Sequence, residues 1–169
     1  MKAVVYEEYC KKTEDGKPDD DFQKILQVKE IDDPKPKPDE VVFKVKAAAL
    51  NYNDIWGMRG EPVPVPLPHV SGSDASGEVI AVGDEVSNIK VGDRVVSHSN
   101  MSCRVCEACT DGREFDCAKR TIWGFQTGPT WGAFSEITHL PEVNVAKIPD
   151  SVSYDDAAAA SMTLLTSWH

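Results

Sequence analysis

The chain has 169 residues, with 18 Lys or Arg against 28 Asp or Glu, so its formal net charge is −10 at pH 7. This length fits one domain, or one domain and the beginning of another, and it suffices for a hydrophobic core. An acidic chain is repelled by phosphate backbones and anionic membranes, which argues against nucleic acid or a membrane surface as the partner. The first residues lack the features of a signal peptide and no apolar run would span a bilayer, so we expect a cytoplasmic protein.

The first forty residues predict two strands separated by an exposed turn. Residues 2–6 are apolar enough for a first strand, and residues 22–29 predict a second one. Residues 14–21 contain a glycine, a proline and three consecutive aspartates, a composition typical of a solvated turn. Residues 33–39 place proline at every second position. Because proline donates no backbone hydrogen bond, we expect a stiff surface connector there.

The middle of the chain is dense in strand signals. Residues 40–50 begin as a strong strand and continue into small residues, and a short helical turn is expected at residues 53–58. Residues 61–68 again alternate with proline, which predicts an extended segment crossing the surface. Residues 77–83 and 91–96 predict two short strands, punctuated by Gly-Asp turns.

Four cysteines follow in the spacing C-x2-C-x2-C-x7-C: Cys103, Cys106, Cys109 and Cys117. The residues between them are mostly polar, so this segment needs a covalent or metal crosslink in place of core burial. Four thiolates close a tetrahedral zinc site with no position open for substrate, which makes such a site structural. Disulfides are the alternative, but the two-residue gaps make pairing awkward and nothing suggests export. We therefore predict structural zinc and interpret Cys10 as an ordinary free thiol.

The last third of the chain predicts two more strands and one helix. Residues 133–137 and 143–148 are the strands, and many short strands with glycine turns indicate a mainly β fold, a barrel or a sandwich. The composition changes after Pro149. Ser153 offers a side-chain cap, acids follow it in the first turn, and residues 157–168 then predict a helix.

The pattern Gly77-x-Val79-x-x-Val82-Gly83, followed by Gly92-Asp93-x-Val95 and the four-cysteine lobe, resembles the medium-chain dehydrogenase/reductase superfamily. The order of elements agrees along nearly the whole chain. The resemblance implies a GroES-like, partly open β-barrel over residues 1–150, with a zinc-binding lobe at 99–120, as the catalytic domain of an NAD(P)-dependent oxidoreductase. Residues 151–169 would begin the helix that leads to a Rossmann domain.

The cofactor's own binding motif is the main element that this sequence lacks. No strand is followed by Gly-x-Gly-x-x-Gly, so NADP or NAD would be bound mainly by the Rossmann domain. We therefore expect residues 1–169 alone to be inactive. The resemblance also implies that the full-length protein is a homo-oligomer.

Departures from the family pattern predict the subtype. Zinc alcohol dehydrogenases carry a cysteine where this chain has Asn51 and a His-Glu pair where it has Ser73-Asp74, and their third catalytic ligand falls near Met162. An amide, a hydroxyl and a thioether do not form a zinc triad, because none supplies imidazole or thiolate. We therefore expect structural zinc but no catalytic zinc. Three histidines are interpreted as packed or surface residues: His69, His98 and His139.

Two segments are similar to the crotonyl-CoA carboxylase/reductase group of this superfamily, in which they line the active site: Asn51-Tyr52-Asn53 and Trp123-Gly124-Phe125-Gln126. The resemblance implies that Asn51 orients substrate or nicotinamide, that Phe125 and Gln126 line the carbonyl or acyl end, and that Thr166 lies near the nicotinamide. That group carries glutamate where this chain has Gln126. A glutamine is neither a general acid nor a base, so carboxylation is in doubt more than reduction. Core packing is the alternative interpretation of Trp123 and Phe125.

The sequence thus predicts the catalytic domain of a cytoplasmic reductase that passes hydride from NAD(P)H to an activated double bond, such as that of an enoyl-CoA. Its partner would be a small-molecule substrate, with an acyl-CoA as the candidate. A zinc-type alcohol dehydrogenase or quinone oxidoreductase is the alternative among enzymes. A zinc-lobe binding module without catalysis is the alternative from another class, and the acidic balance counts against its binding nucleic acid.

Overall fold

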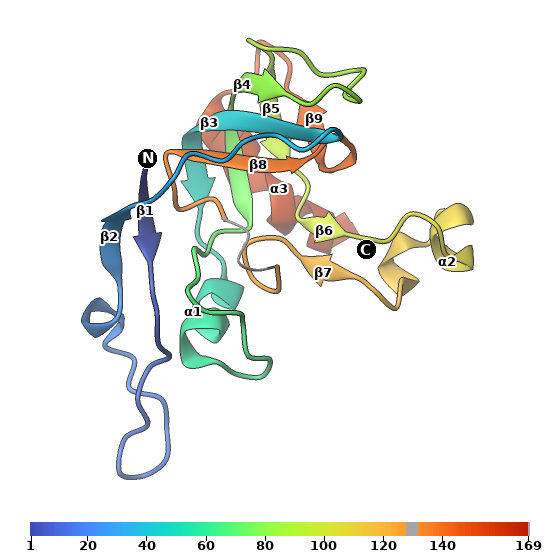
Figure 1. Cartoon of the computed structure of the whole chain (residues 1–169). Coiled ribbons are helices and arrows are strands. Elements are labelled where there is room, and N and C mark those ends of the chain that lie inside the picture. Colours follow the sequence, from blue (N-terminus) through green and yellow to red (C-terminus); the bar gives the residue numbers. More distant parts are fainter. Residues whose placement is uncertain (128–131, 169) are drawn as a thin grey trace.

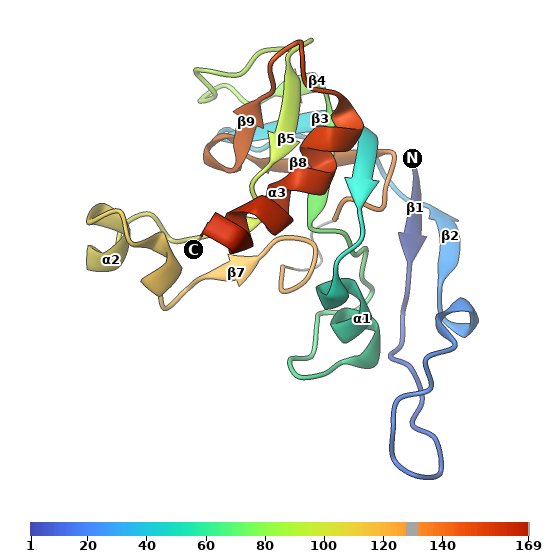
Figure 2. The ribbon, with the colours of Figure 1, turned by 180° about the vertical axis from the view of Figure 1, so that it is seen from behind.

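The centre of the molecule is a curled antiparallel sheet in the strand order β8-β3-β4-β5-β9 (Figure 1). The computed structural model describes residues 1–127 and 132–168. The five strands are β3 (Glu40–Ala49), β4 (Asp74–Val82), β5 (Arg94–Ser97), β8 (Ile137–Pro141) and β9 (Val145–Lys147). The helix α3 (Tyr154–Trp168) lies across one face of this sheet (Figure 2). The mainly β architecture predicted from the sequence is confirmed.

The burial pattern of β3 explains why it is the central strand. Residues 40–43 are all buried, and from Lys44 onward exposed and partly buried positions alternate. The first half is enclosed on both faces, where Val41 and Phe43 pack with Val79 and Trp123 in the largest core cluster. An enclosed strand reads as a continuous apolar run, whereas a half-exposed strand alternates with period two.

Two small sheets flank the barrel on opposite sides (Figure 1). On one side β1 (Lys2–Val5) pairs antiparallel with β2 (Gln27–Glu30). On the other side β6 (Asn100–Met101) pairs with β7 (Thr121–Ile122) at the base of the cysteine lobe. That lobe contains the short helix α2 (Glu107–Thr110) and the 3₁₀ turn η2 (Glu114–Asp116).

The strand predicted over residues 22–29 is correct only in its second half. Residues Phe22–Lys24 form a 3₁₀ turn, η1, and the strand begins at Gln27. Phe22, Ile25 and Leu26 all pack in one apolar cluster with Tyr6. A turn brings residues three and four apart to one side, whereas an alternating strand would have sent Phe22 and Ile25 to opposite faces.

The other predicted strands exist with shifted bounds. The strand predicted at 91–96 is β5, which begins at Arg94 because Gly92 turns the backbone with φ of +89°. The strand predicted at 133–137 is wrong except for its last residue: β8 begins at Ile137, and before it only Ser135 makes an isolated bridge, to Ala3. The strand predicted at 143–148 is preceded by a 3₁₀ turn, η3 (Glu142–Asn144), and shortened to β9.

Both predicted helices are present. The helical turn predicted at 53–58 is the helix α1 (Tyr52–Arg59), which ends at Gly60 in a left-handed conformation. In α3, the Ser153 hydroxyl accepts a hydrogen bond from the Asp156 N–H at 3.0 Å, so the predicted cap is confirmed. The helix extends to Trp168, and His169 lies outside the described residues.

Candidate functional site

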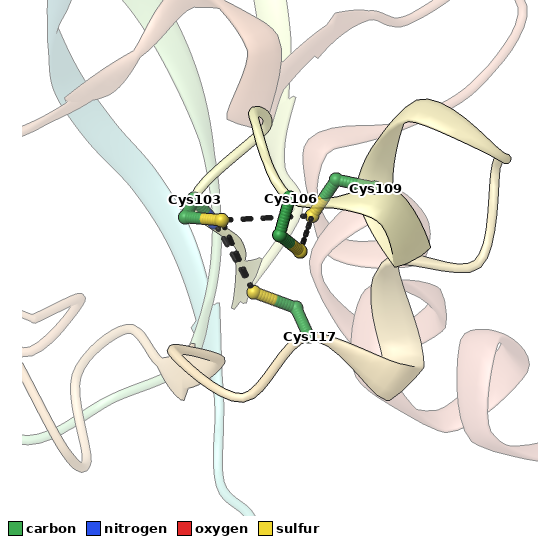
Figure 3. Close-up of side chains that lie close together, drawn as sticks. All are labelled: Cys103, Cys106, Cys109 and Cys117. Carbon is green, nitrogen blue, oxygen red and sulfur yellow. Dashed lines mark hydrogen bonds between the residues drawn. The ribbon is translucent and has the colours of Figure 1, made fainter.

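The cysteine lobe brings four sulfur atoms to a common centre (Figure 3). The four Sγ atoms all lie within 4.8 Å of one another. The Sγ atoms of Cys106 and Cys109 are 3.5 Å apart, and those of Cys103 and Cys117 are 3.6 Å apart. Four sulfur ligands about 2.3 Å from a zinc ion would be separated by about 3.8 Å in a tetrahedron, so the cluster fits zinc. All five cysteines are free thiols, which speaks against the disulfide alternative.

Backbone donors prepare the lobe for a cation. The N–H groups of Val105 and Cys106 lower the pKa of Cys103 to about 6. At Cys106 the N–H of Cys109 also favours the thiolate, but the neighbouring sulfurs of Cys109 and Cys103 outweigh it and raise the pKa to about 11. Adjacent thiolates repel one another, and a divalent cation between them removes that penalty. The four cysteines would therefore hold zinc, which would crosslink the lobe.

Asn51, at the N-terminus of α1, is clamped by two buried carboxyl groups. Its backbone N–H donates to Asp54 Oδ2 at 2.8 Å, and its side-chain Nδ2 donates to Asp74 Oδ2 at 2.9 Å. Asp74 Oδ1 accepts the N–H of Met162 in α3 at 2.9 Å. Asp54 Oδ1 accepts the N–H of Gly72 at 3.0 Å. Asn51 thus connects α1 to the start of β4, and Asp74 extends this connection to α3.

This clamp occupies the positions at which the sequence comparison with zinc alcohol dehydrogenases places catalytic ligands. The three positions do converge, but hydrogen bonds hold them together: the carboxyl group of Asp74 accepts from the Asn51 amide and from the Met162 backbone N–H. Ser73 is buried beside them and its hydroxyl accepts a hydrogen bond from Asn53 Nδ2 at 2.8 Å. Within residues 1–127 and 132–168, the cysteine cluster is the only group of three or more His, Cys, Asp or Glu side chains placed to hold a metal.

Burial makes both carboxyl groups of the clamp hard to ionise. Asp54 is only 3% exposed. Its burial raises the pKa of its carboxyl group to about 6, although the hydrogen bonds from the N–H groups of Asn51 and Gly72 oppose this shift. Burial likewise raises the pKa of Asp74, against the hydrogen bonds from Asn51 and Met162. Perturbed carboxyl groups of this kind gather at functional sites. Asp54 was not among the predicted site residues, although the spacing Asn51-x-x-Asp54 is a recognisable capping pattern.

The loop 122–127 is pressed against the residues before β4. Gly124 has φ of +73°, and a Cβ atom there would lie 1.9 Å from the carbonyl oxygen of Gly72. His69 Nε2 lies 3.0 Å from the Gly124 carbonyl oxygen, and the Gly124 N–H donates to Thr127 Oγ1 at 3.1 Å. These contacts fix the loop next to the clamp, because Gly72 immediately precedes Ser73.

The predicted site residues of this loop differ in their surroundings. Phe125 is buried with Tyr6 in an apolar cluster, and its ring centroid lies 6.4 Å from that of Trp56 on α1. Gln126 is half-buried and its Oε1 accepts the Ile122 N–H at 3.0 Å. One acceptor site of Gln126 is therefore used within its own loop, and its amide NH₂ can donate to another group. Trp123 lies in the barrel core, which agrees with core packing as the alternative interpretation of this residue.

Thr166 and the histidines have distinct environments. Thr166 is exposed on the last turn of α3, one turn beyond Met162. His139 Nδ1 lies 3.0 Å from the carboxylate of Glu40, and His98 borders Asn144, so both have partners within the barrel. His69 contacts Gly124 as described above.

An apolar cavity of 440 Å³ adjoins the clamp on the side of β1. Asn51 and Asp54 line it together with residues of β1, η1, α1 and the segments beside them, among them Val4, Phe22, Leu26, Ile55, Met58 and Phe134. No helix in the described part of the chain is both long and apolar enough to cross a membrane.

Comparison with known proteins agrees with this architecture. Residues 37–150 match the model of the alcohol dehydrogenase GroES-like domain. A crotonyl-CoA carboxylase/reductase of Cereibacter sphaeroides is 36% identical over 159 residues, which cover 90% of this chain and 35% of that protein. An alcohol dehydrogenase of Geobacillus stearothermophilus is 33% identical over 160 residues, covering 94% of this chain and 43% of that one.

A solved NAD-dependent alcohol dehydrogenase has the same fold. It superposes with a TM-score of 0.86 at 38% identity, over 99% of this chain and 45% of that chain. The chain therefore spans less than half the length of these relatives. The family match covers most of the chain and two independent motifs coincide with it. The chain belongs to the alcohol dehydrogenase GroES-like domain family, within the medium-chain dehydrogenase/reductase superfamily.

Proposed function

We propose that residues 1–150 form the catalytic domain of an NAD(P)-dependent oxidoreductase that reduces an activated double bond, such as that of an enoyl-CoA. Residues 151–169 would begin the helix that leads to the cofactor domain. The observation that supports this most is the hydrogen-bonded pair of Asn51 and Asp74, which stands where zinc alcohol dehydrogenases carry zinc ligands. Its donor set lacks the imidazole and thiolate groups that zinc prefers, so the pair is suited to hydrogen bonding with substrate.

Asn51 has the atoms that such a reduction needs. Hydride addition to the β-carbon of an enoyl thioester moves negative charge toward the thioester oxygen, and fixed donors aimed at that oxygen stabilise the transition state. A primary amide has two N–H bonds and two acceptor sites. One N–H of Asn51 is used by Asp74, and its side chain also accepts the Asp54 backbone N–H in a capping box, so the second N–H is the donor that remains for substrate or nicotinamide. Asp74 is a positioning residue, because it determines which atom of the amide faces away from it.

Gln126 and Phe125 would border the acyl end. In this proposal the NH₂ of Gln126 would be a second donor to the acyl end, and Phe125 would close its apolar side. Bound NADPH or NADH would supply the hydride, and Thr166 would lie near the nicotinamide. Zinc held by the four cysteines would crosslink the lobe without taking part in the reaction. The substrate partner would be a small molecule, an acyl-CoA in this proposal, and the complete protein a cytoplasmic homo-oligomer.

A zinc-type alcohol dehydrogenase or a quinone oxidoreductase is the second candidate, supported by the similarity to the Geobacillus alcohol dehydrogenase. The two are separated by assaying the complete protein with NADPH and crotonyl-CoA, with NADPH and a benzoquinone, and with NAD⁺ and ethanol, each before and after mild chelation. We expect reduction of the thioester that survives chelation. Alcohol oxidation that chelation abolishes, without thioester reduction, would contradict the proposal. Asn51→Ala should lower kcat by about 10²-fold or more, the cost of one transition-state donor, whereas the surface variant Asn88→Ala should not.

The identity of residue 126 determines a finer expectation, that protonation of the reduced intermediate dominates over its carboxylation. Hydride addition leaves an enolate that takes up either a proton or carbon dioxide at the α-carbon. Gln126→Glu can keep the bond from the Ile122 N–H through one oxygen and replaces the NH₂ donor with an anionic acceptor. With NADPH, crotonyl-CoA and labelled bicarbonate, the wild type should incorporate label into a minority of product, and the variant into a larger fraction. Majority incorporation by the wild type would refute this expectation.

A further inference from the structure

A second cavity, of 280 Å³, lies between the cysteine lobe and the barrel. The lobe contributes Asn100, Arg104, Glu114 and Arg120 to its wall, and the barrel side contributes His98 and Val143. Leu165 of α3 also lines it, and this residue directly precedes Thr166. The cavity therefore borders the end of α3 at which the proposed function places the nicotinamide.

The two guanidinium groups have donors to spare. Among the residues that the structure describes, Arg104 makes only long contacts, 3.4 Å from Nη1 to the carboxylate of Glu114 and 3.5 Å from Nη2 to the carbonyl oxygen of Val143. Within the same part of the chain, Arg120 uses Nη1 alone, which donates to the carbonyl oxygen of Phe115 at 2.9 Å. Each guanidinium carries five N–H donors in a planar fork that suits oxyanions. Two cations against one carboxylate give this concave site a positive excess in a chain whose net charge is −10.

The backbone conformation of Arg104 also indicates a role for its side chain. Arg104 has φ of +60° and is the only non-glycine residue with positive φ in the part of the chain that the structure describes. A glycine would adopt this turn between Cys103 and Cys106 without strain. The turn therefore does not explain the arginine, and an unusual backbone conformation that carries a cation into a cavity suggests a functional role.

We propose that this cavity binds a phosphate ester, with Arg104 and Arg120 as the cationic ligands and Glu114 as the internal anion that holds Arg104 when no ligand is bound. The inference rests on the proposed function, because both phosphorylated molecules of that reaction, the coenzyme A thioester and the nicotinamide dinucleotide, meet near α3. The chemistry they share is the phosphate group, and the test separates the two sources.

The test compares KM values of the complete protein for crotonyl-CoA, for crotonyl-pantetheine, which has no phosphate, and for NADPH. Arg104→Gln and Arg120→Gln should each raise the KM of one phosphorylated ligand by about tenfold or more, the worth of a charge-assisted hydrogen bond, and leave that of crotonyl-pantetheine within twofold. A rise for crotonyl-CoA assigns the site to the acyl carrier, and a rise for NADPH assigns it to the dinucleotide. Glu114→Gln should lower the same KM.

The matched control is Arg113→Gln, which removes an arginine of the same lobe that is paired with Asp111 and Asp116 and does not line the cavity. Zinc content and circular dichroism confirm that each variant is folded. Unchanged KM values for both phosphorylated ligands in Arg104→Gln and Arg120→Gln would overturn the inference. If the wild type reduces neither thioester, the proposed function fails, and titration of wild type and variants with inorganic pyrophosphate by calorimetry then decides: binding lost in the two variants supports the site, and no binding by the wild type overturns it.

Discussion

Gly124→Ala should destabilise the protein far more than an ordinary glycine substitution. The Cβ atom would lie 1.9 Å from the carbonyl oxygen and 2.5 Å from the carbonyl carbon of Gly72, both backbone atoms. Contacts of this kind require about 3 Å, so the loop 122–127 or the segment entering β4 must move by about 1 Å. Overpacking of this type costs roughly 1–3 kcal/mol. The left-handed backbone adds roughly 1–2 kcal/mol, because alanine carries a Cβ that glycine lacks.

The expected total is a loss of about 2–5 kcal/mol in the free energy of unfolding, measured by urea denaturation followed by tryptophan fluorescence. Gly92→Ala is the matched control, since Gly92 has φ of +89° but no heavy atom within 4 Å of the added Cβ. It should show the backbone cost alone. The difference between the two variants isolates the contact between the loop and Gly72. Equal losses in both would refute the claim that the loop is pressed against the start of β4.

Two further perturbations test the lobe and the clamp. Cys109→Ser should lower the zinc content below one equivalent and expose the lobe to proteolysis. The barrel has its own core, so its far-ultraviolet circular dichroism should not change. A protease-resistant lobe with a full equivalent of zinc would contradict this. Asp54→Asn should change the pH dependence of stability. The folded pKa of Asp54, about 6, lies above its ordinary value of 3.8, so the wild type loses stability from this group as pH rises from about 4 to about 6, by up to about 3 kcal/mol. The wild type's stability relative to Asp54→Asn should fall over that window, and a constant difference between pH 4.5 and pH 7.5 would exclude the shift.

Most of the fold could be predicted from local sequence patterns. The apolar run at 40–50 and the short apolar segment at 77–83 located β3 and β4, Ser153 located the start of α3, and the cysteine spacing located the lobe. The predicted GroES-like barrel is confirmed by the family match and by the superposition with a known dehydrogenase. The exception was η1, where three apolar residues were read as a strand because their common target, the cluster around Tyr6, lies far away in the sequence.

The site was less predictable, because it depends on contacts between distant segments. Asn51 and Asp74 are 23 residues apart, and Asp74 and Met162 are 88 apart. The resemblance indicated that these positions converge but not that hydrogen bonds join them. Neither the hydrogen bond from the Ile122 N–H to the Gln126 side chain nor the cavity beside Arg104 can be predicted from composition or spacing, because both depend on loop conformation. The capping pattern of Asn51 and Asp54 was readable and went unused.

The most direct test of this account is zinc X-ray absorption on the complete protein, together with its metal content. The central claim is that zinc crosslinks the lobe through Cys103, Cys106, Cys109 and Cys117, while the clamp around Asn51 works through hydrogen bonds. The account predicts one zinc per chain with four sulfur ligands at about 2.3 Å. A second equivalent of zinc with oxygen or nitrogen ligands, whose removal abolishes activity while the lobe stays loaded, would contradict it.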